Sequence, residues 1–277
     1  MNAIQAIRVE GGIVPSSLLQ LLRDGTLGPD GSRSPSSFHI AGRQTIADAV
    51  NRSWTYLVGA WTAWLETQAR EPGGMGSTNS AVVRECWLLI LLQELGYGRL
   101  TPSHGVQIDD QSYPISHEWN EVPIHLLGPG VDLDRRNPGV SGAARAPQAM
   151  VQEVLNRDDR RLWALLSNGL KLRLLRDSTA LAGSAYVEFD LQTIFEGELF
   201  SEFMILWQLC HQSRLEPRLG PEGDPIPSQC WLELWREDSI RTGARALDQL
   251  RDGVESALRQ LGSGFLTHRD NGSLREA

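Results

Sequence analysis

Two aspartates in the segment VDLDRR, Asp132 and Asp134, carry the kind of carboxylate that binds Mg²⁺ in nucleases. With Glu153 as a third acid they are the candidate catalytic residues. A PD-(D/E)xK nuclease also needs an acid two residues before a lysine, because metal and lysine together activate the attacking water. The only lysine of the chain is Lys171, and Gly169 stands two residues before it. The usual nuclease signature is therefore incomplete, and Mg²⁺ is expected only if an unusual arrangement holds.

Arginines offer a simpler role for the two aspartates and a second kind of chemistry. Arg135 and Arg136 follow Asp134 directly, so the acids can pair with them and hold the loop. The same arginines belong to a set of basic side chains able to contact phosphates. The candidate DNA-binding residues are Arg135, Arg136, Arg145, Lys171, Arg173 and Arg176.

Histidines and cysteines give weaker candidates. His117 and His125 flank the segment EWNEVPI, with Glu118 and Glu121 nearby, but their spacing matches no standard metal-ligand pattern. A packing role is the simpler interpretation, and no metal site is expected there. The pair Cys210-His211 lies on an apolar helix and is interpreted as core (residues 210–211).

A glycine-rich segment, LGSGFL at residues 261–266, resembles the S-adenosylmethionine loop of adenine methylases. That loop follows a buried strand ending in an acid, whereas the preceding VESALRQL has a helical pattern and contains no Asp-Pro. The chain also lacks an N-P-P-[YFW] motif to hold a flipped base. We interpret the segment as a helix C-cap with glycines, so no cofactor is expected in this chain.

Three of the candidate DNA-binding residues, Lys171, Arg173 and Arg176, lie in a predicted hairpin at residues 161–179, RLWALLSNGLKLRLLRDST. Asn168-Gly169 between two apolar runs predicts a type I′ turn, which needs positive φ at both positions. On the second strand, alternation puts Leu172 and Leu174 on one face and Lys171 and Arg173 on the other. The pattern predicts one buried face and one wet, basic face.

The remaining elements are read from periodicity and turn residues. Apolar residues at spacings of three and four predict helices at residues 45–69, 79–96, 148–156, 198–213 and 229–261. Short runs bounded by Gly, Pro and Asp predict strands at residues 105–109, 112–116, 122–127 and 184–191. The expected class is α+β, or mixed α/β, with N-terminal helices, a central mixed sheet and C-terminal helices.

Composition limits the setting of these elements. The Gly/Pro/Ser segment at 25–37 predicts a linker, and the expected parts are 1–43, 44–215 and 216–277. The net charge of −8 works against general affinity for nucleic acid, so DNA contact needs a local basic patch. No apolar run is long enough to span a bilayer, and three cysteines without a C-x-x-C pair favour a reducing cytoplasm.

Several segments together resemble the N-terminal region of large bacterial adenine-specific DNA methylases. These are the type IIG restriction-modification enzymes and their relatives in the DISARM and BREX phage-defence systems. The matching segments are NRSWTYLVGAW (51–61), RECWLLILLQELGYGRL (84–100), the stretch from YPISHEWNEVPIHLL onwards (113–157), LWALLSNGLKLRLLRDST (162–179), AYVEFDLQTIFEGELFSEFMILWQLCHQSR (185–214) and LGSGFLTH (261–268). The resemblance covers nearly the whole chain in order and spacing.

In that family the matching region precedes the methylase core, which carries the cofactor loop and the N-P-P-Y motif. The resemblance therefore implies a leading module alone, such as a fragment or a split gene product, with S-adenosylmethionine bound only by a separate core. In related restriction enzymes this region has a PD-(D/E)xK nuclease fold. Here the strand that would carry the acid-x-lysine motif reads VPIHLLGPG, with neither residue. The resemblance thus implies a degenerate nuclease scaffold without its catalytic groups.

Three functions remain open from the sequence. The first is a non-catalytic module of a phage-defence or restriction-modification methylase that contacts DNA through the basic set or contacts partner subunits. The second is a Mg²⁺-dependent nuclease using Asp132, Asp134 and Glu153. The third is a pure assembly domain that docks onto other defence subunits or a methylase chain and never meets DNA, which the net charge favours.

Overall fold

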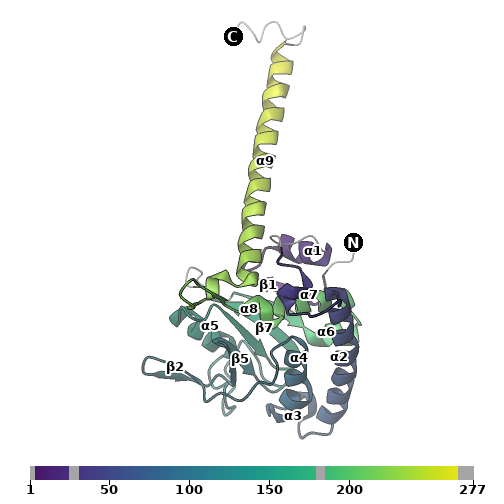
Figure 1. The fold of residues 1–277 in the computed structure, drawn as a ribbon, viewed down its shortest axis with the longest axis vertical. Helices are drawn as coiled ribbons and strands as arrows, with labels where there is room; N and C mark the ends of the chain where they lie inside the picture. The colour runs from purple at the N-terminus through teal and green to yellow at the C-terminus, as the bar shows by residue number, and fades with distance from the viewer. Residues whose placement is uncertain (1–3, 25–30, 179–184, 268–277) are drawn as a thin grey trace. The chain divides into compact units, whose positions relative to one another are not determined.

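The computed structural model describes residues 4–24, 31–178 and 185–267 (Figure 1). Contacts divide the chain into two units, Met1–Arg236 and Glu237–Ala277. Residues 25–30 of the expected linker lie outside the described residues, as do residue 184 of the strand expected at 184–191 and residue 268 of LGSGFLTH. The remainder of the linker segment contains the short 3₁₀ helix η1 (Pro35–Phe38).

The first unit is organised around a mixed sheet of six strands in the order β1-β8-β7-β6-β5-β4. Neighbouring strands are antiparallel except β5 and β6, which are parallel and are joined through the crossover helix α5 (Pro147–Arg157). The strands are β1 (Ile7–Glu10), β4 (His117–Trp119), β5 (Val122–Leu126), β6 (Trp163–Ser167), β7 (Lys171–Arg176) and β8 (Tyr186–Asp190). This sheet with its helices confirms the expected mixed α+β class.

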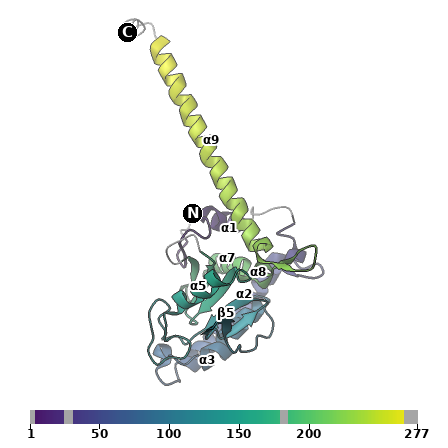
Figure 2. The same cartoon turned by 90° about the vertical axis from the view of Figure 1, so that its left-hand side faces the viewer.

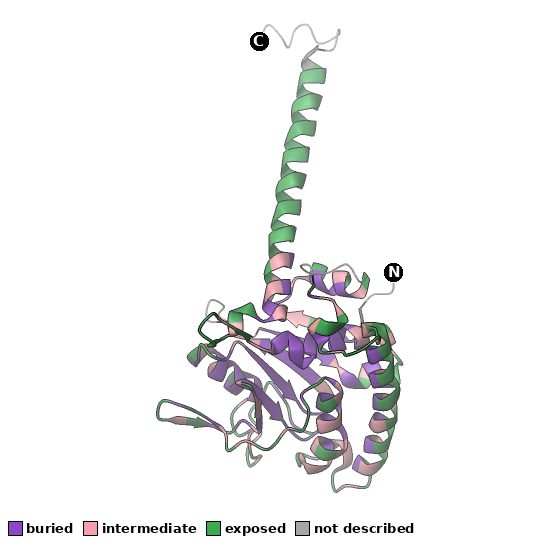
Figure 3. Ribbon diagram, viewed as in Figure 1, coloured by how far each residue is buried: buried purple, intermediate pink, exposed green. Residues whose placement is uncertain are grey.

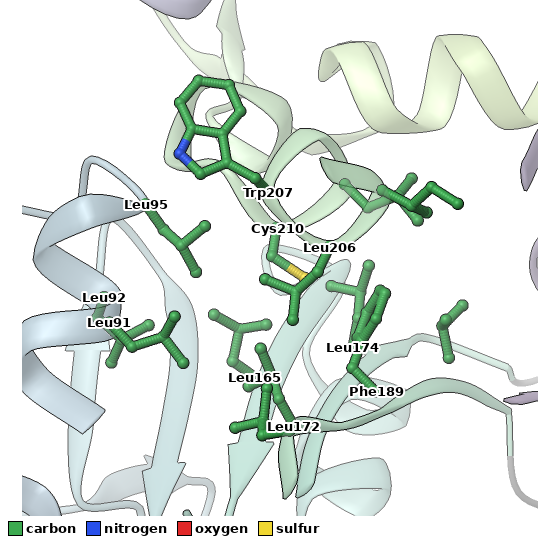
Figure 4. Close-up of a cluster of buried hydrophobic side chains, with 14 of the residues drawn as sticks. Leu91, Leu92, Leu95, Leu165, Leu172, Leu174, Phe189, Leu206, Trp207 and Cys210 are labelled. Carbon is green, nitrogen blue, oxygen red and sulfur yellow. The ribbon is translucent and has the colours of Figure 1, made fainter. Parts of the chain in front are cut away.

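Helices cover one face of this sheet. They are α1 (Ser16–Asp24), α2 (Ile46–Gln68), α3 (Ala81–Val83), the π-helical turn η3 (Arg84–Leu88), α4 (Leu89–Glu94), α6 (Leu191–Glu196), α7 (Phe200–Cys210) and α8 (Gln212–Leu215). The close-up in Figure 4 shows leucines from the C-terminal part of the α4 segment facing Leu165 and Leu172 of the sheet, with Leu206 and Cys210 of α7 above them. Alternate apolar side chains of the sheet pack against these helices and form the larger of two hydrophobic cores.

Helix α2 shows how local sequence sets one of these elements. Thr45 and Asp48 form a reciprocal capping box, in which each side chain accepts from the other's backbone N–H, at 3.1 and 2.9 Å. The helix expected at residues 45–69 is therefore confirmed. Its buried tryptophans Trp61 and Trp64 pack on Trp87 with ring centroids 5.1 and 6.2 Å apart.

The opposite face of the sheet is covered by α5 and by the small hairpin of β2 (Val106–Ile108) and β3 (Gln111–Tyr113). Leu166 and Leu175 of the sheet belong to this second core. The solvent-exposed face predicted for the 161–179 hairpin is therefore wrong at the centre of the strands. There, α5 and the loop at residues 130–134 cover it. Arg173, expected to point into solvent, is 2% exposed. Figure 3 shows the central strands buried along most of their length.

The connection between β6 and β7 also differs from the predicted type I′ turn. Only Gly169 has positive φ, at 88°, and Asn168 does not share that conformation. The Asn168 side-chain oxygen accepts from the backbone N–H of Leu170 and Lys171, at 3.2 and 3.0 Å. Asn168 thus closes a three-residue loop with its side chain, which removes the need for a second left-handed residue.

The chain after α8 contains β9 (Arg218–Leu219), β10 (Pro225–Ile226), the short helix η4 (Pro227–Gln229) and α9 (Trp231–Thr267). The long C-terminal helix expected at 229–261 is confirmed. It continues through LGSGFL, so Gly262 and Gly264 lie inside the helix and the predicted C-cap there is wrong. Within the described ranges, no helix is both long and apolar enough to cross a membrane.

Candidate functional site

Strand β7 places the two central residues of the basic set. Lys171 and Arg173 are two residues apart and lie on the sheet face that α5 covers. The β7–β8 register pairs Arg173 directly with Glu188, so the acid of β8 stands beside both cations. Asp134 reaches the same place from the loop that precedes α5. We call Asp134, Gln148, Lys171, Arg173 and Glu188 the Arg173 network.

Arg173 donates hydrogen bonds from all three of its guanidinium nitrogens in this network. Its Nη1 and Nη2 donate to the two carboxylate oxygens of Asp134 at 2.6 and 2.8 Å, which is a bidentate pair. Its Nε donates to Glu188 at 2.6 Å, and Nη1 also reaches the Gln148 side-chain oxygen at 3.2 Å. The guanidinium carbon lies 4.3 Å from the centroid of the Tyr186 ring. Lys171 completes the set by donating to the second Glu188 oxygen at 2.9 Å.

Hydrogen bonds keep Arg173 and Asp134 of this network ionised. Burial disfavours the charged form of Arg173, but the hydrogen bonds that it donates to Asp134 and Glu188 outweigh this effect and raise the pKa of Arg173 above its usual value. The hydrogen bonds from Arg173 lower the pKa of Asp134 despite partial burial. The charges of Arg173 are thus neutralised inside the chain, which leaves little attraction for an external phosphate.

A cavity of about 400 Å³ opens beside the network, lined by residues 130–134 together with Asn168, Lys171 and Arg173. It brings together Asp132, Asp134 and Lys171, three of the residues singled out for metal-dependent or phosphate chemistry. The carboxylate of Asp134 is occupied by Arg173, as described above. Asp132 uses Oδ1 to accept from the backbone N–H of Asp134 at 2.8 Å, a local turn bond.

The other basic residues of the set do not join Lys171 and Arg173. Arg176 makes a bidentate pair with the buried Glu233, at 2.9 and 2.8 Å. Arg145 pairs with Glu153. Arg135 lies 3.8 Å from Asp132 with most of its side chain in solvent, and Arg136 is exposed, with no ion pair to any residue that the structure describes. Arg135, Arg145 and Arg176 thus each pair with a different acid, and Arg136 pairs with none of the described residues.

Glu153, the third candidate for a metal site, belongs to another cluster. Its carboxylate accepts from the Tyr113 hydroxyl at 2.7 Å and pairs with Arg145 and Arg157. The Tyr113 hydrogen bond is the largest effect that lowers the pKa of Glu153. Among the residues described in the structure, no group of three or more His, Cys, Asp or Glu side chains is placed to hold a metal ion.

His117, His125 and Cys210 are buried and pack against neighbouring residues. His125 accepts from the backbone N–H of Ser116 through Nδ1 at 3.2 Å and donates from Nε2 to the carbonyl of Gly142 at 2.8 Å. Burial lowers the pKa of His117 and of His125 to about 4, so both are neutral near pH 7. Cys210 is fully buried in the larger core, where burial raises the pKa of its thiol.

Sequence reasoning missed the acids that complete these networks. Glu188 and Glu233 are buried and each binds two basic side chains. The segment YVEFD does predict a cationic partner for Glu188, because an acid in an otherwise apolar strand needs a buried cation beside it. Pairing that strand with KLRLLR would have placed Glu188 beside Arg173. Glu233 lies at the start of α9, and no local pattern connects it with Arg176.

Comparison with known proteins adds no relative: no protein-family model, curated protein or solved structure matches this chain.

Proposed function

We propose that this chain is a non-catalytic module that assembles with protein partners in an adenine-methylase system of the restriction-modification or phage-defence kind. The observation that carries the proposal is the Arg173 network. Its two cations are paired with acids of the same chain, and Arg173 is buried. Strand β7, for which a phosphate-binding face was predicted, therefore links the sheet to the loop before α5. The methylase context rests on the segment resemblance.

The order of elements supports a degenerate nuclease scaffold without its chemistry. The segment α3 to α4, the antiparallel pair β4–β5, the crossover helix α5 and the parallel strand β6 follow one another as in such an enzyme. In that arrangement β5 would carry the acid and the lysine. All five residues of β5 are buried, and its one ionisable side chain, His125, is kept neutral by burial.

Charge and surface chemistry favour protein over nucleic acid as the partner. The formal net charge is −8, and the exposed Arg135 lies 3.8 Å from Asp132, an acid that lines the cavity. Most of the exposed large apolar side chains that the structure describes lie on α9, where they suit contact with another protein. The three free cysteines fit the expected reducing cytoplasm.

Binding of the full chain to a 30-base-pair duplex, titrated from 50 to 200 mM salt with and without Mg²⁺, tests this proposal. We expect a dissociation constant weaker than about 100 µM at 150 mM salt, the weak end of non-specific binding, and uncut DNA. Binding below about 1 µM that falls steeply with salt and is weakened by Arg135→Ala with Arg136→Ala would establish a DNA-contacting module instead. Mg²⁺-dependent cutting that Asp132→Ala abolishes would establish the nuclease.

A further inference from the structure

Large apolar side chains recur along one side of α9 in the second unit. Between residues 237 and 265 they are 44–71% exposed, and Figure 3 shows nearly all of this stretch as exposed. The exposed members in the well-spaced part are Ile240, Leu247, Leu250, Val254, Leu258 and Leu261. Ile240, Leu247, Val254 and Leu261 are seven residues apart, Leu250 lies three residues after Leu247, and Leu258 flanks this heptad series four residues after Val254.

The second heptad position alternates in size. It is occupied by Gly243, Leu250 and Ala257, each three residues after a member of the first series. We call the two series together, residues 240, 243, 247, 250, 254, 257 and 261, the α9 seam. A seam sustained over more than three heptads is typical of a two-stranded coiled coil.

The part of α9 in the second unit needs a partner for its own stability. It contains Gly243, Gly253 and Gly262, each of which weakens a helix relative to alanine. A Cβ built at any of these three glycines meets no other atom within 4 Å. Most helical stability in proteins comes from packing of an apolar face, so a glycine-containing helix with its apolar face in solvent indicates an absent contact.

Charges lie away from the seam. Arg241 pairs with Asp238 at 3.0 Å and Arg259 with Glu255 at 2.6 Å, both within the helix. Arg251 is the one charged residue that flanks the seam directly, and it lies 3.6 Å from Asp248 of its own helix. A core depleted of charge, with ion pairs on the outer side, is the usual anatomy of an interface.

We propose that the α9 seam is a self-association surface that pairs antiparallel with the α9 seam of a second copy of this chain. The choice of partner rests on the alternation of size along the seam. If Leu250 lies opposite Val254 of the second copy, then Leu247 lies opposite Ala257 and Gly243 lies opposite Leu261. Each layer then joins a large side chain with a smaller one or two of middle size, which fills the interface evenly.

Parallel pairing matches the residues less well. It would bring Gly243 against Gly243 and Ala257 against Ala257, leaving gaps that cost stability. The antiparallel alignment is centred on residue 252, the midpoint of residues 237–267, so it uses the whole described part of α9 in the second unit. It also sets the two helix dipoles antiparallel, so that the positive end of each helix lies beside the negative end of the other. Arg251 approaches its own copy near the centre, where Asp248 in each helix offsets the like charge.

The area available agrees with a weak, specific dimer. The stretch from 240 to 264 is about 37 Å long and about 11 Å wide. A third of its accessible surface comes to about 500 Å² per copy, or about 1,000 Å² for the pair, which is near the lower limit of a specific interface. We therefore expect association in the micromolar range.

Sedimentation equilibrium of the full chain across about 1–200 µM tests the pairing. We expect the mass to rise from 30.7 kDa towards twice that value. Leu250→Asp should raise the dissociation constant about 100-fold, because it buries an unpaired charge. The matched control, Gln249→Asp, adds the same charge one residue away from the seam and should change the constant less than about threefold. A monomer at 200 µM, or a dimer that Leu250→Asp leaves intact, would overturn the proposal.

Orientation is tested by cysteine cross-linking in a Cys86→Ser background, since Cys86 is the half-buried cysteine and the other two are buried. Mixing tagged Gly243→Cys chains with untagged Leu261→Cys chains should give a cross-linked heterodimer, and neither variant alone should cross-link. In the antiparallel pair, residue 243 of one copy is about 27 Å from residue 243 of the other. Cross-linking of Gly243→Cys alone would show parallel pairing and refute the assignment.

This inference rests on the proposed function but can fail separately from it. A chain that stays monomeric and does not bind DNA would refute self-pairing and leave an assembly role with a different protein. A chain that dimerises through the seam and also binds duplex DNA would confirm self-pairing and refute the proposed function.

Discussion

Replacing Arg173 by methionine tests whether the Arg173 network holds the sheet together. Methionine keeps much of the apolar volume of the arginine stem but removes the guanidinium that joins Asp134, Gln148 and Glu188. The side chains of Arg173 and Glu188 are only 3% and 8% exposed, so their contact counts as a buried pair. That of Asp134 is 56% exposed and can be hydrated when it loses its partner.

The expected cost follows from what stays paired. Removing one partner of a buried ion pair typically costs about 3–5 kcal/mol, because the other charge is left without compensation. Here Lys171 still neutralises Glu188, at 2.9 Å, so we expect the lower end, about 3 kcal/mol. For a unit of this size that is a fall in Tm of about 6–12 °C.

Urea unfolding followed by tryptophan fluorescence measures this loss. Arg135→Met is the matched control, since its side chain is 85% exposed and its ion pair with Asp132 spans 3.8 Å. We expect the control to change stability by less than about 1 kcal/mol. Adding Glu188→Met to Arg173→Met should recover at least about 1 kcal/mol, because no buried carboxylate then remains in the Arg173 network. An Arg173→Met variant within about 1 kcal/mol of the unmodified chain would refute the reasoning.

Two further predictions concern the glycines and the histidines. Gly169→Ala should destabilise by about 2 kcal/mol or more, because φ is 88° and a Cβ would lie 2.3 Å from the Val83 side chain, whereas Gly59→Ala on open helix surface should stabilise by about 0.5–1 kcal/mol; chemical unfolding of both variants checks this, and an equal effect would contradict it. Burial lowers the folded-state pKa of His125 to about 4, so its contribution to stability is complete above pH 6.5 and is lost as pH falls towards 4, at about 1.4 kcal/mol per pH unit. His125→Gln should therefore show a shallower loss of stability than the unmodified chain between pH 6.5 and 4, and equal slopes in unfolding titrations would contradict it.

Local patterns were enough to place most elements in the sequence. The helix at α2 follows from its cap and its apolar spacing, and the β6–β7 hairpin follows from Asn168-Gly169 between two apolar runs. The type of turn was not predictable, because it depends on the Asn168 side chain bonding to the backbone of the following residues. Periodicity reports which residues share a face, and it does so correctly for Leu172 and Leu174.

Burial of the opposite face was not predictable from the same pattern. Alternation of Leu with Lys and Arg is the signature of a half-buried strand, and it carries no information about α5, which is brought over the sheet by a crossover. The partners of Arg173 come from residues 134 and 188, which lie 39 and 15 residues away in the chain. Such long-range ion pairs decide whether a basic strand is a binding surface or an internal support.

Two-wavelength sedimentation velocity of the full chain with a fluorescent duplex at 50 mM salt and Mg²⁺ tests the central claim most directly. If the chain is a non-catalytic, protein-contacting module, the duplex will sediment alone and intact. If the α9 seam pairs with a second copy, the protein will also self-associate with rising concentration. A duplex that moves with the protein, or one that is cut, would contradict the account.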